Sequence, residues 1–396
     1  MARLVVRAPR MLDGRGSPPV EDATLICDKG RITYAGPTAE APPHTSEDVV
    51  WEAPGGSTLI PGLIDCHVHL CFDGTADFAA EAREMNGSRA ALKAARNARR
   101  ALDAGITTVR DLGGFELAML DVARAQRDGV ITGARILTAP AVLTVTGGHG
   151  HFIGWEVDSA DELVKAVRKL VKAGADWIKI MSTGGVLTPG IGAQRSAYTV
   201  EQLTAVMDEA HEAGVRVATH AIGGEGIVRA LRAGVDSVEH GCFLSDEALK
   251  LMHENGSWLV ATLVAPDRIL HGGEGVPEFA IRKSEEVSVS HHESFRRAVE
   301  AGVRIAAGTD AGTPFNHHGG LWRELALMHG AGMPLERVVA AATSEAASLL
   351  GVDAGELAAG KIADAVVLDG DPLTDVSAYE RVGLVVQDGR IVHGGG

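Results

Sequence analysis

Residues 59–70 read LIPGLIDCHVHL, an apolar run that ends at the histidine pair His67 and His69. The run predicts a buried strand, because it is short and almost wholly apolar. Side chains at positions i and i+2 of a strand point to the same face, so both imidazoles would lie together and suit one metal ion. Taken alone, a His-x-His pair is a weak signal, and placement in the core is the competing interpretation.

Short apolar runs and long amphipathic stretches alternate along the chain after this segment. Four stretches have helical periodicity and end in glycine, and Thr199 with Gln202 predicts a capping box at the start of one of them. About eight strand–helix alternations favour a (β/α)8 barrel over a doubly wound sheet. The seven further expected strands cover residues 106–113, 134–140, 176–182, 215–221, 235–241, 256–264 and 303–310.

The two ends of the chain have a different sequence pattern: short runs of alternating apolar and polar residues, separated by Asp-Gly, Lys-Gly and Pro-Gly pairs. Neither end has enough residues to bury a core by itself. We therefore expect residues 1–57 and 358–396 to form one small composite β-sandwich, and residues 58–357 to form the barrel.

Composition excludes several classes of protein. Of the 396 residues 45% are hydrophobic, which is ample for a large core, and the formal net charge of −15 argues against nucleic acid or an anionic membrane as a partner. The four cysteines are too few for a disulfide framework, and no apolar stretch approaches the length of a membrane span. We expect a soluble, cytoplasmic protein with reduced thiols.

Residues with metal or acid–base chemistry recur at the ends of the expected strands. His220, His240 and Asp310 each stand near such an end, and Lys179 interrupts the apolar run DWIKIMS. A buried lysine is costly unless it is paired or chemically altered. Functional groups of a barrel lie at the C-terminal ends of its strands, so this distribution indicates one site there.

These residues and the motifs around them resemble the amidohydrolase superfamily of metal-dependent hydrolases. The resemblance covers nearly the whole chain and includes PGLIDCHVHL, the lysine of the fourth strand, GTDAG and the tail segment AAGKIADAVVLDGDP. It is most similar to the prolidase-like (Xaa-Pro dipeptidase) and imidazolonepropionase-related branch, through TTVRDLGG, TGGHGH, IKIMSTGGV, SAYT and GLWRELALM.

The resemblance implies a binuclear metal centre with Asp310 as the general base and acid. The first two histidines would hold one ion and the later two the other, while CO2 would convert the lysine into a bridging carbamate. A bridging hydroxide would attack the substrate, and Asp310 would pass its proton to the leaving amine. Zinc suits these ligands best, with manganese, iron or cobalt as alternatives. The implied ligands are His67, His69, Lys179, His220, His240 and Asp310.

Other residues near the strand ends are candidates for substrate binding. His149 and His151 belong to a glycine-rich loop that is also consistent with solvent exposure, and Tyr198 is equally consistent with a hydrophobic staple. His317 follows the eighth strand together with His318, and Arg195 is a candidate for binding a carboxylate. The candidates for substrate binding are thus His149, His151, Tyr198 and His317.

Several residues near these motifs are interpreted as structural. We expect Arg110 and Asp111 to form a buried ion pair, Cys66 to lie in the core, and Gly184 with Gly185 to permit a tight turn. No role is assigned to His44, His211, His253, His271, His291, His292, His329 and His393.

Three functions follow in order of preference. The first is hydrolysis of a peptide-like amide, in a dipeptide or an N-acyl amino acid, and the second is hydrolysis of a cyclic amide, imidazolone, lactone or carbamate. Deamination fits poorly, because Glu225 lies five residues after His220. The third is a non-catalytic metal-binding scaffold. Such relatives generally lose metal ligands, whereas all six implied ligands are present here. A small molecule is the expected partner, and the family resemblance suggests a homo-oligomer.

Overall fold

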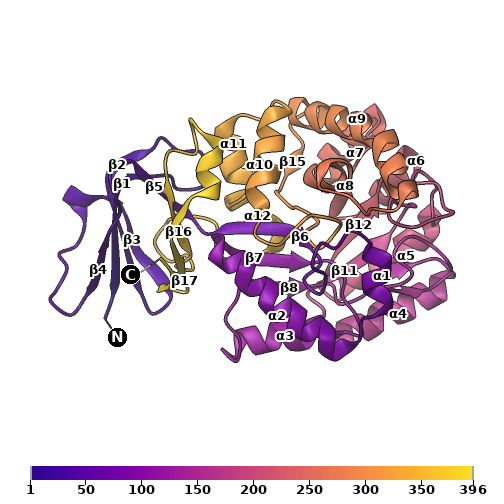
Figure 1. Cartoon of the computed structure of the whole chain (residues 1–396), viewed down its shortest axis with the longest axis horizontal. Coiled ribbons are helices and arrows are strands. Elements are labelled where there is room, and N and C mark those ends of the chain that lie inside the picture. Colours follow the sequence, from indigo (N-terminus) through magenta and orange to yellow (C-terminus); the bar gives the residue numbers. More distant parts are fainter. Residues whose placement is uncertain (1, 395–396) are drawn as a thin grey trace.

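The computed structural model describes residues 2–394. A small sheet lies at one side of a larger body in which parallel strands alternate with helices (Figure 1). No helix among the described residues is both long and apolar enough to cross a membrane.

The small sheet joins the two ends of the chain. Strand β5 pairs antiparallel with β16, from Ser57 opposite Asp369 to Pro61 opposite Ala365. The strand order is β18-β17-β16-β5-β1-β2-β3, with β4 paired to β1, so the pairing gives one continuous sheet. The predicted sandwich of two sheets stays a prediction. The strands are β1 (Leu4–Met11), β2 (Val20–Asp28), β3 (Arg31–Pro37), β4 (Val49–Glu52), β5 (Ser57–Pro61), β16 (Ala365–Asp369), β17 (Val382–Gln387) and β18 (Arg390–His393).

The strands of the larger body are all parallel and pair in two sets, β6-β7-β8 and β10-β9-β11-β12-β13-β14-β15. All eight predicted strands are present, and β9 and β10 are additional. Their bounds are β6 (Leu63–Val68), β7 (Ile106–Asp111), β8 (Arg135–Thr138), β9 (Val142–Thr144), β10 (Gly154–Glu156), β11 (Trp177–Met181), β12 (Arg216–Ala221), β13 (Ser237–His240), β14 (Trp258–Val260) and β15 (Arg304–Ile305).

The segment after β15 lies beside β6. The backbone N–H of Asp310 donates to the carbonyl of His67 at 2.7 Å, and that of His69 donates to Ala311 at 2.8 Å. These bonds bring the first and last predicted strands together, although the strand pairing does not form a closed ring. The mixed α/β fold with parallel strands is confirmed, and closure of the barrel stays a prediction.

Helices connect the parallel strands and cover them. The predicted capping box is confirmed: the hydroxyl of Thr199 accepts from the N–H of Gln202, whose side chain accepts from the N–H of Thr199. The helices are α1 (Phe78–Arg83), α2 (Gly87–Asp103), α3 (Ala118–Arg127), α4 (Ala160–Ala173), α5 (Val200–Glu212), α6 (Gly224–Arg232), α7 (Asp246–Asn255), α8 (Val264–His271), α9 (Glu278–Glu300), α10 (Leu321–Gly330), α11 (Leu335–Ala341) and α12 (Ser344–Leu350), with short 3-10 turns η1 (Thr38–Glu40) and η2 (Val376–Glu380).

Apolar side chains fill the space between the parallel strands and the helices, and a separate apolar cluster lies under the small sheet. A third cluster includes Cys66, Trp177 and Trp258 on the strands. Cys66 is therefore a core residue, as predicted. The four cysteines are all buried and free.

Candidate active site

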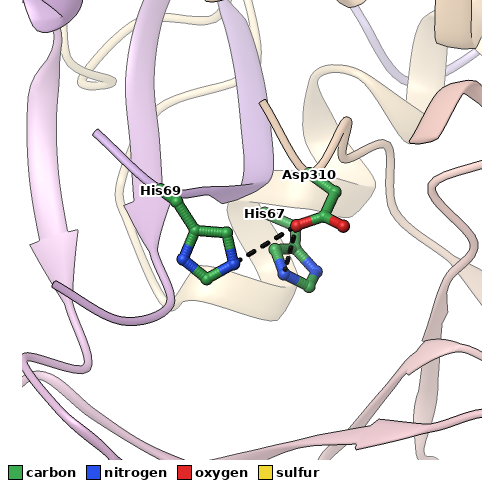
Figure 2. Close-up of side chains that lie close together, drawn as sticks. All are labelled: His67, His69 and Asp310. Carbon is green, nitrogen blue, oxygen red and sulfur yellow. Dashed lines mark ion pairs between the residues drawn. The ribbon is translucent and has the colours of Figure 1, made fainter. Parts of the chain in front are cut away.

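Asp310 lies between the two histidines of β6. Its Oδ1 atom is 3.3 Å from Nε2 of His67 and 3.2 Å from Nε2 of His69, and Figure 2 shows both rings directed at this carboxylate. Ligand atoms of these three buried residues lie within 4.8 Å of one another, so they can hold a metal ion.

Each ring of the β6 pair is anchored through its other nitrogen. Nδ1 of His69 lies 3.0 Å from the carbonyl of Gly113, and Nδ1 of His67 lies 2.9 Å from the carboxylate of Glu239. Both partners accept hydrogen bonds, so Nδ1 carries a proton in each ring and Nε2 is the nitrogen that faces Asp310. This arrangement is typical of histidines that bind metal.

His220 and His240 extend the cluster from the neighbouring strands β12 and β13. The ring centroids of His220 and His240 are 4.6 Å apart, and those of His67 and His240 are 5.2 Å apart. Nε2 of His220 lies 2.8 Å from the carbonyl of Gly184, and Nδ1 of His240 lies 2.7 Å from the hydroxyl of Thr262. Each ring therefore keeps one nitrogen free for a ligand.

Lys179 completes the set from β11. Its Nζ is buried and has no hydrogen-bond partner among the described residues. Burial lowers the pKa of this amine to about 8. All six candidate ligands line one cavity of about 740 Å³. An unpartnered lysine beside four histidines and a carboxylate fits a binuclear centre with a modified lysine.

The backbone is strained at two of these residues. His240 has φ of 72° and Asp310 has φ of 61°, in the left-handed region that residues with a Cβ rarely adopt. Such conformations persist where the surrounding structure enforces them, and they concentrate at functional sites.

Burial also sets the protonation of the site. It lowers the pKa of His67, His220 and His240 well below the usual value, so these rings are neutral near pH 7. Burial opposes ionisation of Asp310, but its neighbours, His69 among them, outweigh it and lower the pKa of that carboxyl to about 2. Burial lowers the pKa of His69 too, but its pairing with Asp310 outweighs burial and raises that pKa. The three neutral imidazoles and the ionised carboxylate are in the forms that bind cations.

Arg110 does not pair with Asp111, contrary to the prediction, because consecutive residues of β7 point to opposite faces. Its guanidinium instead donates to Glu239 at 2.8 Å, to Ser237 at 3.0 Å and to the carbonyl of Cys66 at 2.6 Å. Asp111 accepts from the N–H of Leu70 at 2.8 Å. The ion pair is buried as expected, but Glu239 is its acidic partner.

Sequence reasoning missed Glu239 and Asp65, which both position the site. Asp65 accepts from the N–H of His67 at 3.2 Å and from the hydroxyl of Thr309 at 2.7 Å, so it ties β6 to the segment that carries Asp310. Each could have been found in the sequence as an acidic residue inside a mainly apolar strand. Glu239 also stands directly before His240.

The structure brings His149 to the cavity but leaves the other predicted substrate-binding residues outside its lining. The hydroxyl of Tyr198 donates to the carbonyl of Val157 at 2.9 Å. Nδ1 of His151 lies 3.0 Å from the carbonyl of Gly148, and Nδ1 of His317 lies 2.9 Å from that of Asp73. Their roles in substrate binding stay predictions.

The loop 184–192 packs over His149. A Cβ on Gly185 would overlap the His149 ring, and one on Gly184 would overlap the carbonyl of Gly192. These glycines therefore permit close packing, and neither has the positive φ of a glycine-dependent turn. Lys283 of α9 holds the same loop, because its Nζ donates to the carbonyls of Gly185, Thr188 and Ile191 at 3.2, 2.6 and 2.5 Å.

His291, to which the sequence analysis assigned no role, also lines the cavity. It lies on the buried stripe of α9, whose members recur at helical spacing. This periodicity was the signal that could have placed it facing the strands. The stripe comprises Ala280, Ser284, Val287, His291, Ser294, Phe295 and Ala298.

Comparison with known proteins identifies the family. The model of the amidohydrolase family matches residues 58–392. The chain belongs to the amidohydrolase family. The predicted resemblance is thereby confirmed, and membership of the family supports a hydrolase that acts on a small molecule.

Relatives of this amidohydrolase include proteins with different names. It is 31% identical to ochratoxinase from Aspergillus niger, over 99% of this chain and 87% of that protein. It is 29% identical to imidazolonepropionase from Acidiphilium cryptum, over 99% of this chain and 97% of that protein. A solved Xaa-Pro dipeptidase with bound methionine superposes with a TM-score of 0.91 at 32% identity, over 98% of this chain and 99% of that one.

Proposed function

We propose that this amidohydrolase hydrolyses a peptide-like amide bond in a small molecule, a dipeptide or an N-acyl amino acid, with two divalent metal ions. The observation that carries the proposal is the buried Lys179 amine, which has no hydrogen-bond partner among the described residues yet lines a cavity with four histidines and Asp310. The names of the relatives, an ochratoxinase and a Xaa-Pro dipeptidase among them, are consistent with it.

In the proposed centre, His67, His69 and Asp310 hold one ion, and His220 with His240 holds the other. Zinc is the proposed metal, because histidine and carboxylate ligands suit it. When bound, the cations would lower the pKa of a water molecule and polarise the scissile carbonyl.

Lys179, as a carbamate, would be a ligand shared by the two proposed metal ions. Its neutral amine forms a C–N bond to the carbon of CO2 and releases one proton, so that a cationic side chain becomes an anionic oxygen ligand. This change removes the cost of a buried lysine charge. It also supplies a carboxylate from β11, where the sequence offers no acidic residue.

Asp310 is the proposed proton carrier. Its Oδ1 faces His67 and His69, which leaves Oδ2 to take a proton from the attacking water and deliver it to the leaving nitrogen. Hydrolysis then yields a carboxylate and an amine.

Residues beside this centre support a substrate with a carboxylate. His149 lines the main cavity and also an adjoining one of about 360 Å³, which Arg195 lines as well. Nδ1 of His149 lies 2.9 Å from the hydroxyl of Thr188, which leaves Nε2 free. We assign His149 to the substrate carbonyl and Arg195 to the carboxylate.

A hydrolysis screen of zinc-loaded protein in bicarbonate tests the proposal. The panel contains dipeptides, N-acyl amino acids, lactones and cyclic imides, and bound metal is counted in the same preparation. Two metal ions per chain with turnover of an amide series support the proposal. Turnover of the lactones or cyclic imides alone would replace the proposal with hydrolysis of a ring substrate. Bound metal without turnover of any compound would contradict both reactions.

We also propose that the parallel strands of residues 58–357 close into an eight-stranded barrel and that residues 1–57 and 358–396 form the second domain. The hydrogen bonds between β6 and the segment of Asp310 support closure. The sheet that joins β1–β4 to β16–β18 through β5 supports a second domain made from both ends of the chain, although β5 (Ser57–Pro61) extends this sheet four residues past the predicted boundary. An experimental structure with bound metal tests both.

A further inference from the structure

The cavity beside the proposed metal centre is apolar away from the metal ligands. Its walls include Phe152, Val186, Leu187, Ile222 and Val287. Among the described residues that line it, Asp310 is the only carboxylate and Lys179 the only lysine or arginine, and both belong to the proposed metal centre. A charged substrate group would lose its hydration here without gaining a counter-charge, so the walls favour an uncharged, apolar group.

Besides the proposed metal ligands, His149 and Thr313, the lining contains one further imidazole, that of His291. His291 has 1% of its surface exposed, and its Nε2 lies 2.7 Å from the carbonyl of Ala261. A carbonyl only accepts, so the proton is on Nε2 and Nδ1 carries a lone pair. This Nδ1 is buried and has no hydrogen-bond partner among the described residues. Buried polar atoms are nearly always paired, so an unpaired acceptor in a cavity wall indicates a ligand that brings a donor.

We propose that His291 is a specificity-determining residue whose Nδ1 accepts a hydrogen bond from an N–H or O–H group on the uncharged, apolar part of the substrate. This inference rests on the proposed function and narrows it: the preferred substrate is an N-acyl amino acid with a neutral acyl group, and a free dipeptide, whose ammonium would enter the apolar cavity, is disfavoured. The imidazole acts as a neutral acceptor at one end and stays tethered to Ala261 at the other.

Substrates of matched shape test the charge preference. N-(3-phenylpropanoyl)-L-phenylalanine, its phenyllactoyl analogue and L-phenylalanyl-L-phenylalanine carry hydrogen, hydroxyl and ammonium at the same carbon. A 3-(4-hydroxyphenyl)propanoyl analogue places a hydroxyl at the far end of the acyl group. We expect kcat/KM to be at least about tenfold lower for the ammonium compound than for the plain one, and about fivefold higher for one of the hydroxyl compounds. A preference for the dipeptide would overturn the inference, as would the absence of any hydroxyl preference.

Two substitutions separate ligand binding from a structural role. His291→Asn places an amide oxygen near the position of Nδ1 but cannot reach Ala261, whereas His291→Gln can reach Ala261 but leaves no acceptor at the Nδ1 position. We expect the ratio of kcat/KM between the hydroxyl and plain substrates to survive in His291→Asn and to fall to about one in His291→Gln. The opposite result, with the ratio kept only in His291→Gln, would show that the tether alone matters. Ratios within one variant do not depend on the fraction of folded protein.

Binding distinguishes failure of this inference from failure of the proposed function. If the metal-loaded enzyme hydrolyses none of the four substrates, calorimetric titration with 3-phenylpropanamide, phenyllactamide, 3-(4-hydroxyphenyl)propanamide and phenylalaninamide gives the same comparison without turnover. Tighter binding of one of the two hydroxyl amides than of the plain amide, lost in His291→Gln, would uphold the role of His291 while the proposed reaction fails. Tighter binding of the ammonium compound would overturn the inference.

Discussion

The carboxylate of Glu239 lies 2.9 Å from Nδ1 of His67, at the opposite side of the ring from the Nε2 that faces Asp310. Both residues are fully buried, and Arg110 holds the other oxygen of Glu239. The orientation of one candidate metal ligand therefore depends on an ion pair that spans β7 and β13.

Substitution of Glu239 tests this dependence. We expect Glu239→Gln to weaken metal binding by about 10- to 100-fold, because the amide no longer fixes the tautomer and direction of the His67 ring. The measurement is the metal content after dialysis against a series of chelator concentrations. Glu225→Gln, an exposed glutamate of α6, is the matched control. Equal metal retention in both variants would contradict the role of Glu239.

Loss of Lys179 is expected to abolish most activity. Lys179→Ala removes the proposed bridging ligand, so we expect kcat to fall at least about a hundredfold and to recover in part with added formate or acetate. Lys165→Ala, on the exposed face of α4, is the control and should behave like the unmodified chain. Near-normal turnover of Lys179→Ala without added carboxylates would exclude the carbamate.

His318 is expected to make the fold sensitive to acid. Burial lowers its pKa to about 4, and its Nε2 lies 2.9 Å from the carbonyl of Phe72. Between about pH 6.5 and 4 the unfolded chain binds a proton that the folded chain does not, so stability falls as the pH falls through this window. The full loss from this residue is on the order of 3 kcal/mol.

The comparison for His318 is the free energy of urea unfolding at pH 7 and pH 4.5, on metal-free protein. His318→Gln cannot titrate, so the difference between the two pH values should shrink by about 2 to 3 kcal/mol, while other buried histidines affect both proteins alike. An unchanged difference would mean that the pKa of His318 is the same in the folded and the unfolded chain.

Lys283 is expected to hold the loop over the cavity. Lys283→Met removes three hydrogen bonds to the carbonyls of the loop 184–192, so amide hydrogens of this loop should exchange faster and KM should rise. Hydrogen–deuterium exchange of a peptide that spans the loop measures the first effect. Arg282→Met, at the exposed neighbouring position, controls for the loss of a cation. If both variants exchange alike, the loop is held by other contacts.

Most of the strands and helices could be predicted from the sequence, because apolar periodicity and the glycines that end helices are local signals. It also indicated the six candidate ligands, since five of them stand near the end of a predicted strand and Lys179 is a lone charged residue inside an apolar one. What it could not show was the pairing of side chains across strands: the partner of Arg110 proved to be Glu239, which lies 129 residues away. His291 was missed for a related reason, because the face that a helix turns toward the strands depends on packing.

The pairing of β5 with β16 has a consequence for the order in which the chain is made. Strand β5 ends at Pro61, and its partner begins at Ala365. At a synthesis rate of about 5–20 residues per second, the ribosome needs on the order of 15–60 seconds to supply the second strand after the first. During that interval β5 presents an open edge in the nascent chain, which is the kind of edge that chaperones protect and that other strands can capture. The small sheet is therefore completed only after the ribosome has produced nearly the whole protein.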